Sequence, residues 1–163
     1  IYVDAIVSIQ GFRLRSSGSP GVFRVVEELP RVSGGEKFTI EECRNSLKYL
    51  ETEEYKMTRG YHTAALCGKD GLLQRAYDVG RHNAVDKVLG MGILNCVDFE
   101  KIFLLVSGRI SQGMVAKCVR CGISLLVSKA AILDSAIAKC GETGLSVVSF
   151  ATNIAVKGDS IEV

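Results

Sequence analysis

The sequence has almost no net charge. Its 20 Lys and Arg residues stand against 18 Asp and Glu residues, which leaves a net charge of +2 over 163 residues. Proteins that grip nucleic acid along its backbone carry a strong excess of basic residues. Composition therefore predicts no nucleic-acid partner, although a few cations gathered at one site would not show in this sum.

Long apolar runs are also missing. The longest, such as "KIFLLVSG", end well before the roughly 18 residues that a membrane-spanning helix requires, and no positively charged leader precedes them. We therefore expect no membrane partner. With 47% hydrophobic residues the chain can still bury a substantial core, so one compact soluble domain is the default prediction.

The ligand pattern of a zinc enzyme is absent. The chain has two histidines, and its one C-x-x-C, Cys118 to Cys121, has no second pair and no H-x-E motif. The pair falls in the middle to late part of an expected helix, not at the amino terminus, where the dipole lowers a thiol pKa. Cys118 also continues the apolar face of Met114 and Val115. We interpret both cysteines as buried and structural, and we predict no zinc.

The six cysteines do not follow the spacing of a small secreted scaffold held by disulfides. They occur within apolar helix-like or strand-like stretches, which favours a reducing compartment. They are Cys43, Cys67, Cys96, Cys118, Cys121 and Cys140.

The first 21 residues differ from the rest. The chain begins at Ile1, not Met, inside the extended stretch "IYVDAIVSIQGFRLR", and we expect it to be a fragment of a longer protein. "SSGSPG", residues 16–21, then indicates a flexible break, because Gly, Ser and Pro favour turns and bury little. We predict that residues 1–21 are the end of a smaller amino-terminal domain and that residues 22–163 form the main domain.

Local patterns predict the elements of the main domain. Thr39 and Glu42 form a T-x-x-E capping box before a helix predicted over residues 40–56, whose apolar face is spaced at helical intervals. "YHTAALCG" and "LLQRAYDV" predict a β-hairpin through a D-G turn. A further helix begins at Gly80. The apolar faces of the two helices comprise Ile40, Cys43, Leu47 and Leu50, and Ala84, Val85, Val88 and Leu89.

The second half alternates strands and helices. The apolar strands "IFLLVS", "SLLVS" and "LSVVSF" are separated by amphipathic helices, which favours parallel strands with right-handed crossovers and helices on the faces of the sheet. We predict an α/β fold. Ligands of such sheets lie beyond the carboxyl ends of the strands. The residues that follow the predicted strands are Ser107, Gly108 and Arg109; Ser128 and Lys129; Thr152 and Asn153; and Gly80, Arg81, His82 and Asn83.

Arginine, lysine and a helix amino terminus at one end of a sheet would make a positive site for phosphate. In this interpretation Asp78 orients or caps the corner, Gly80 permits the tight turn, and Arg81 and His82 face a ligand. Each residue alone has a structural alternative. A lone cation after a strand is usually solvated, Asp78 could simply cap the helix, and His62 and His82 could be buried, hydrogen-bonded imidazoles.

Four segments together resemble a known family. "TRGYHTAALC", "DVGRHNAVDKVLG", "LLVSGRISQGMVAKCVRCGISLLVS" and "AKCGETGLSVVSFA" closely resemble the formate dehydrogenase accessory protein family, over about residues 37–151. The resemblance implies a cytidine deaminase-like α-β-α layered fold without the zinc centre, corresponding to the carboxyl-terminal domain of the family. It also implies a cytoplasmic homodimer.

The function implied by this resemblance is sulfur transfer. Family members are sulfurtransferases that accept sulfur from a cysteine desulfurase as a persulfide. They pass it to the bis-molybdopterin guanine dinucleotide cofactor of formate dehydrogenase. By matching position, the resemblance places in the cofactor cleft His62, Asp78, Gly80, Arg81, His82, Asn83, Ser107, Arg109 and Lys129. A further cofactor-binding stretch comprises Phe150, Ala151, Thr152, Asn153, Ile154 and Ala155.

The chain departs from the family at the loop that carries sulfur. The family has a working C-x-x-C on a loop upstream of the first long helix, and this chain has Ser17, Gly18, Ser19 and Pro20 there. Serine cannot form a persulfide. Two hypotheses stay open: a sulfurtransferase whose transfer loop is altered or only partly included, and a cofactor-binding module or chaperone without sulfur chemistry. A deaminase is disfavoured because its metal ligands are absent.

Overall fold

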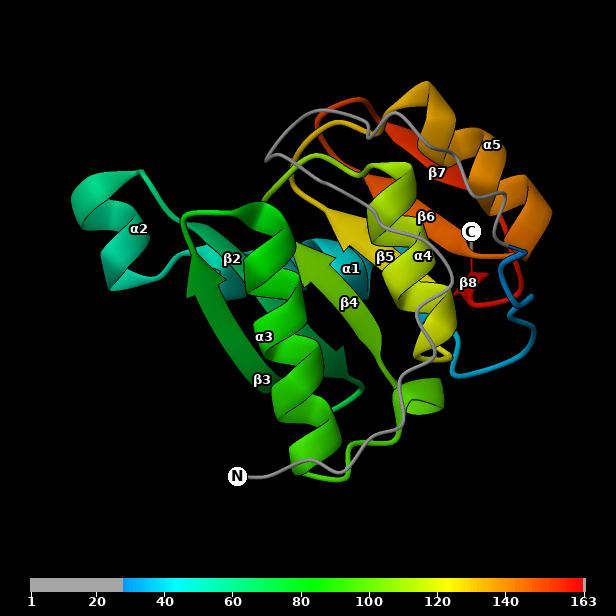
Figure 1. Cartoon of the computed structure of the whole chain (residues 1–163), viewed down its shortest axis with the longest axis horizontal. Helices are drawn as coiled ribbons and strands as arrows, with labels where there is room; N and C mark the ends of the chain where they lie inside the picture. Colours follow the sequence, from blue (N-terminus) through cyan, green and yellow to red (C-terminus); the bar gives the residue numbers. More distant parts are fainter. Residues whose placement is uncertain (1–27, 163) are drawn as a thin grey trace, which may run out of the picture.

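The computed structural model describes residues 28–162. The predicted end of an amino-terminal domain at residues 1–21 lies outside the described residues. The described part is built on a mixed six-stranded sheet (Figure 1). In spatial order its strands are β3 (Gly71–Asp78), β2 (His62–Gly68), β4 (Phe103–Val106), β5 (Leu125–Ser128), β6 (Ser146–Ser149) and β7 (Ile154–Val156).

Strands β4, β5 and β6 are parallel, and β2 and β7 run antiparallel to their neighbours. The connections between the parallel strands are α4 (Gln112–Arg120) and α5 (Asp134–Thr143). All residues of β4, β5 and β6 are buried, as expected of strands covered on both faces. The predicted α/β class, the crossover pattern and the hairpin of β2 and β3 are thereby confirmed.

Helices cover both faces of the sheet. In Figure 1, α3 (Arg81–Leu94), α4 and α5 lie in front of the sheet, and α1 (Ile40–Ser46) lies behind it. The front core contains the predicted inward residues Ala84, Val85, Val88 and Leu89 of α3. The rear core contains Phe38, Cys43 and Leu50, packed on the other face of β2, β4 and β5. The alternation of side chains along β2 divides it between the two cores.

The remaining elements are short. A two-stranded parallel sheet joins β1 (Phe38–Thr39) to β8 (Ile161–Glu162). The 3₁₀ helix η1 (Leu47–Leu50) follows α1, and a second 3₁₀ helix, η2 (Phe99–Lys101), precedes β4. Another short helix, α2 (Glu53–Thr58), has no buried residue and projects away from the rest of the fold in Figure 1.

The single helix predicted over residues 40–56 is wrong. The chain tightens into η1 after Ser46, leaves helical geometry at Glu51 (φ −88°, ψ 88°), and starts again at α2. Thr52 is the reason for the restart, since its buried side chain accepts a hydrogen bond from the backbone nitrogen of Tyr55 at 3.1 Å. The break lets Leu50 stay in the rear core while α2 turns outward.

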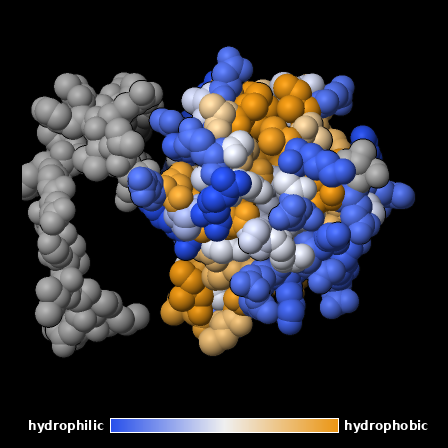
Figure 2. Space-filling model, turned by 90° about the vertical axis from the view of Figure 1, so that its right-hand side faces the viewer, coloured by the Kyte–Doolittle hydropathy of each residue, from blue (hydrophilic) through white to orange (hydrophobic). Residues whose placement is uncertain are grey.

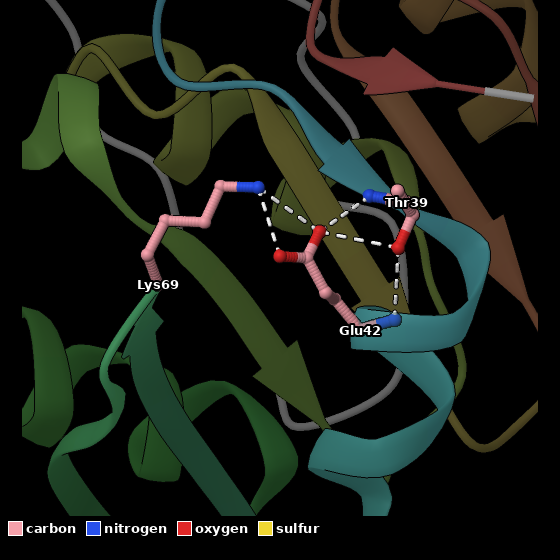
Figure 3. Close-up of polar contacts among 3 residues, drawn as sticks. All are labelled: Thr39, Glu42 and Lys69. Carbon is pink, nitrogen blue, oxygen red and sulfur yellow. Dashed lines mark hydrogen bonds and ion pairs between the residues drawn. The ribbon is translucent and has the colours of Figure 1, made fainter.

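The predicted capping box is present and gains a third partner. The backbone nitrogen of Glu42 donates to Thr39 Oγ1 (3.1 Å), and Glu42 Oε2 accepts from the backbone nitrogen of Thr39 (2.7 Å). Lys69, in the β2–β3 turn, donates to both oxygens of the same carboxylate, at 2.8 and 3.0 Å (Figure 3). This contact ties the hairpin turn to the start of α1.

Cys96 does not lie inside an apolar helix or strand as expected. It is exposed in the turn after α3, with a left-handed φ of 52° that ends the helix. The other five cysteines are buried or half-buried. Among residues 28–162, no helix combines the length and apolarity needed to span a bilayer.

The molecular face that includes α5 is mostly polar. Figure 2 shows hydrophilic side chains over much of this face, with hydrophobic side chains gathered in separate patches between them. In Figure 1 this face lies on the opposite side of the molecule from α2 and the start of β2.

Candidate functional site

Four strands present their termini at one end of the sheet. The register pairs His62, at the start of β2, with Asp78, at the end of β3, while Ala64 pairs with Val106 and Val106 with Ser128. The segments after β3, β4 and β5 therefore leave the sheet next to the start of β2. We call this the open end of the sheet, since the hairpin turn lies at the other end of β2 and β3.

Asp78 braces the corner between β3 and α3. Its Oδ1 accepts from the backbone nitrogen of Gly80 at 2.9 Å and from Asn83 Nδ2 at 3.2 Å, and its Oδ2 lies 2.6 Å from Lys87 Nζ. The hydrogen bonds from Lys87, Gly80 and Asn83 lower the pKa of Asp78 to about 2. Gly80 itself is the N-cap and no side chain caps the helix. Asp78 therefore fixes the corner and so the position of Arg81.

Ser107 links β4 to the start of β2. Its Oγ accepts from the backbone nitrogen of Thr63 at 2.9 Å, and its backbone nitrogen donates to the Thr63 carbonyl at 2.9 Å. The same Oγ lies 3.4 Å from His62 Nδ1. Ser107 and His62 are thus held side by side at the open end.

Gly108 allows Arg81 to approach β4 closely. A Cβ at position 108 would lie 2.9 Å from Arg81 Cβ and 3.3 Å from His62 Nδ1. Ser128 Oγ donates to the Gly108 carbonyl at 2.8 Å and fixes this loop. Within the part of the chain that the structure describes, the buried Nε of Arg81 has no hydrogen-bond partner. A charged side chain is therefore held in place with one donor unused.

The electrostatics of His62 show that positive charge accumulates here. Partial burial and the charges of Arg81 and Arg109 lower the pKa of His62 below its usual value. Both arginines therefore lie within electrostatic reach of the imidazole and disfavour its protonated form. An anion at the open end would offset the same repulsion.

A cavity of about 260 Å³ adjoins this group of residues. Lys129 lies at its wall, with Nζ 3.6 Å from Glu51 Oε1 and 6.0 Å from the ring centroid of Tyr55. Three predicted residues, His62, Ser107 and Lys129, line the cavity. Sequence reasoning missed the other five: Leu50, Tyr55, Arg59, Gly60 and Tyr61. The aromatic and basic residues in "YKMTRGYH", at the connection into β2, were the available signal.

Other predicted residues occupy different surroundings. His82 Nε2 lies 3.4 Å from Ser111 Oγ, and its carbonyl accepts from Lys117 Nζ at 3.2 Å, so His82 sits where α3 meets α4. Phe150, directly after β6, lies 5.0 Å below the guanidinium of Arg44. The remaining residues of that stretch are exposed on the turn before β7 and on β7: Ala151, Thr152, Asn153, Ile154 and Ala155. None of the six lines the described cavity.

Burial disfavours the thiolate form of the buried cysteines. Burial raises the pKa of Cys118, and the pKa values of Cys43 and Cys67 are raised to about 12. Cys118 is buried in α4, as predicted from the sequence, whereas Cys121 follows the helix and is half-buried, so the prediction that it too is buried is wrong. Among residues 28–162 no three His, Cys, Asp or Glu side chains are placed to bind a metal together.

The fold is an α/β domain, and its open end gathers Arg81, His62 and Ser107 beside the cavity. Comparison with known proteins then gives the family. The FdhD/NarQ family matches residues 14–157, most of the chain, and the chain belongs to that family.

Named relatives agree. The sulfur carrier protein FdhD of Bacillus subtilis is 34% identical over 119 residues, which cover 72% of this chain and 45% of the relative. The corresponding protein of Wolinella succinogenes is 46% identical over 90 residues, covering 55% of this chain and 32% of its own length. The chain thus spans about half the length of the first of these relatives and a third of the second.

A solved structure shares the fold. A crystal structure assigned to a formate dehydrogenase accessory protein from Desulfotalea psychrophila superposes with a TM-score of 0.68 and 26% identity. The match covers 74% of this chain and 53% of the other. The predicted membership in the formate dehydrogenase accessory protein family is confirmed.

Proposed function

We propose that this chain is the cofactor-binding part of a formate dehydrogenase accessory protein. Its client is bis-molybdopterin guanine dinucleotide, which reaches formate dehydrogenase after it has received sulfur. The observation that carries this proposal is the group of Arg81, Arg109 and Lys129 around His62, with the buried Nε of Arg81 unsatisfied. The names of the relatives, a sulfur carrier and an accessory protein, support the same role.

The residues at the open end fit the diphosphate groups of such a ligand. Guanidinium groups bind phosphate through paired hydrogen bonds, and a buried charge without a partner is costly. A diphosphate oxygen at Arg81 would satisfy Nε and reduce the repulsion between the arginines and His62. Ser107 and the loop at Gly108 would then present fixed polar groups to the ligand.

The source of sulfur in this proposal is a cysteine desulfurase, which delivers sulfur as a cysteine persulfide. The first cysteine of this chain is Cys43, and burial raises its pKa to about 12. A thiolate is needed to accept sulfur. These facts favour a second candidate, a binding module or chaperone that holds the cofactor without carrying sulfur itself.

The resemblance also supports three finer proposals. The layers in front of and behind the sheet would correspond to those of the cytidine deaminases, the protein would act as a homodimer, and it would work in the cytoplasm. None of these is needed for the ligand site. Analytical ultracentrifugation of the purified chain tests the dimer, which predicts twice the mass of the 163-residue protein.

Calorimetric titration with GDP tests the binding role. GDP supplies the nucleotide end of the cofactor without its pterin, and we expect saturable binding that weakens as salt rises, because phosphate contacts are screened. Guanosine, which keeps the base and ribose of GDP but lacks phosphate, serves as the matched control ligand and should bind much more weakly. Absence of any GDP affinity would refute the proposal.

Mass spectrometry separates the two candidate functions. The chain is incubated with a cysteine desulfurase and cysteine, then weighed before and after reduction. A gain of one sulfur atom that is lost on reduction supports sulfur transfer through a thiol of this chain. An unchanged mass, together with GDP binding, supports the binding module.

A further inference from the structure

The cavity beside the arginine group contains features that phosphate binding does not explain. Two half-buried tyrosines, Tyr55 and Tyr61, line it together with the apolar side chain of Leu50. Tyr55 comes from α2, and Tyr61 from the connection between α2 and β2. Phosphate groups are recognised by cations and backbone nitrogens, and aromatic rings add little to that contact.

Both tyrosines are held in place from outside the cavity. The ring of Tyr61 packs edge-to-face against Tyr77 of β3, with centroids 5.5 Å apart and an interplanar angle of 83°. The backbone of Tyr55 is fixed by Thr52, the buried N-cap of α2. Lys129 is drawn toward the same wall by Glu51. These contacts fix the ring of Tyr61 and the backbone at Tyr55.

The cavity and the arginine group share two residues. His62 and Ser107 line the cavity, and the loop that follows Ser107 brings Gly108 against Arg81. A ligand that filled the cavity could thus reach the arginines past His62 without crossing the sheet. At about 260 Å³ the cavity is slightly smaller than a typical small-molecule pocket of about 300 to 1,000 Å³, so it suits one planar fragment of a larger ligand.

We propose that Tyr55 and Tyr61 bind the planar base of a nucleoside diphosphate whose phosphates lie at Arg81 and Arg109. Stacking on aromatic side chains is the usual way that proteins hold an unpaired base. This inference rests on the proposed function and adds the ring-binding half of the same site. It assigns α2, which buries none of its own residues in the core, the role of carrying one wall of the ligand site.

The test compares two ligands, GDP and inorganic pyrophosphate, on single variants. Tyr55→Ala and Tyr61→Ala should each weaken GDP binding by about 5- to 150-fold, the range for loss of one stacked base, and leave pyrophosphate binding unchanged. Tyr55→Phe keeps the ring and should restore GDP affinity. Met57→Ala, an exposed position on the same helix, is the matched control and should change neither. Thermal unfolding of each variant checks that it is folded.

Each remaining outcome counts against the inference. If wild-type protein binds GDP no more tightly than pyrophosphate, or if both tyrosine variants keep full GDP affinity, the ring site is wrong and the phosphate site stands. If the tyrosine variants lose GDP and pyrophosphate equally, the tyrosines act on the phosphate end, and the ring site is again wrong. If the wild type binds neither ligand, the proposed function fails and this inference fails with it.

Discussion

The two ends of the β2–β3 hairpin both place cations beyond a strand, but in different surroundings. At the turn, Lys69 donates to both oxygens of Glu42 and lies 4.8 Å from the ring centroid of Phe38 (Figure 3). At the open end, Arg81 packs closely on Gly108, and its buried Nε has no partner in the described chain. The cation at the turn is therefore paired within the protein, whereas Arg81 keeps one buried donor unused.

The acidic residues explain this difference. Hydrogen bonding from Lys69 is the main cause that lowers the pKa of Glu42, so the two charges at the turn satisfy each other. The acid nearest in sequence to Arg81 is Asp78, and it is occupied by Lys87 and by the backbone of the corner. Carboxylates are present at both ends, but those at the open end, Asp78 and Glu51, pair with Lys87 and Lys129 and leave Nε of Arg81 without a partner in the described chain.

Removal of the Arg81 side chain should have the largest effect on GDP binding. If GDP affinity did not fall, the two ends of the hairpin would not differ as argued above. Arg81→Ala should weaken GDP binding by about 1.5 to 3 kcal/mol, the usual value for a hydrogen bond to a charged group. The free energy of unfolding should change little, because Nε has no intramolecular partner to lose. Calorimetry and urea unfolding measure the two quantities.

Lys101→Ala is the matched control for Arg81→Ala. Lys101 is an exposed cation at the end of η2, just before β4 begins, and so lies at the opposite end of that strand from Ser107. This variant should retain full GDP affinity. An equal loss in both variants would show that net charge, and not a site at the open end, governs binding.

Glu42→Ala should have the next largest effect, on stability and not on binding. The substitution removes the reciprocal hydrogen bond of the capping box and leaves Lys69 without its carboxylate. Loss of a cap costs about 1 kcal/mol, so the urea midpoint should fall while GDP affinity stays constant. Glu41→Ala changes the neighbouring exposed acid in the same helical turn, and it should lower the urea midpoint by less than Glu42→Ala. Impaired GDP binding in Glu42→Ala would contradict the separation of the two ends.

Much of this arrangement could be predicted from local patterns. The capping box, the D-G hairpin and the inward face of α3 follow from local spacing, the parallel strands follow from the alternation of strands and helices, and all are found. The burial of Cys118 could also be predicted, because its position continues the apolar face of α4. These features depend on residues within a few positions of one another.

The cavity could not be predicted in the same way. Tyr55 and Tyr61 meet Ser107 and Lys129 only because the helix predicted over residues 40–56 breaks at Thr52 and redirects the chain across the open end. The break itself lies within a favourable helical pattern, and tertiary packing of Leu50 outweighs the helical propensity. The environment of Lys69 was equally hidden, since its partner Glu42 lies 27 residues away.

Asp78→Asn should produce a smaller loss of stability, which is present at neutral pH and shrinks in acid. The pKa of Asp78 is lowered to about 2 in the folded protein, against an ordinary value of 3.8. The ionised carboxylate therefore stabilises the fold above about pH 4, and this contribution is lost as pH falls from 4 through 2. In Asp78→Asn that part of the pH dependence should disappear. Urea unfolding at pH 7, 4 and 3 measures it, and Asp86→Asn, at an exposed acid on α3 outside the corner, is the control.

The smallest effect is expected for Lys69 itself, and it sharpens the comparison most directly. The side chains of Lys69 and Glu42 are 42% and 39% exposed, so water and salt screen their attraction in spite of good geometry. A double-mutant cycle of Lys69→Met and Glu42→Gln should give a coupling free energy of about 0.2 to 1 kcal/mol that shrinks in 1 M salt. A coupling well above this range, insensitive to salt, would mean that the pair is effectively desolvated. The same partial exposure leaves Lys69 accessible to anions in solution. A phosphate group should bind Lys69 only when the carboxylate of Glu42 is removed, because Glu42 otherwise occupies the same donors. Titration of Glu42→Gln with pyrophosphate therefore asks whether the carboxylate alone distinguishes the turn from the open end, and weak new binding is the expected answer.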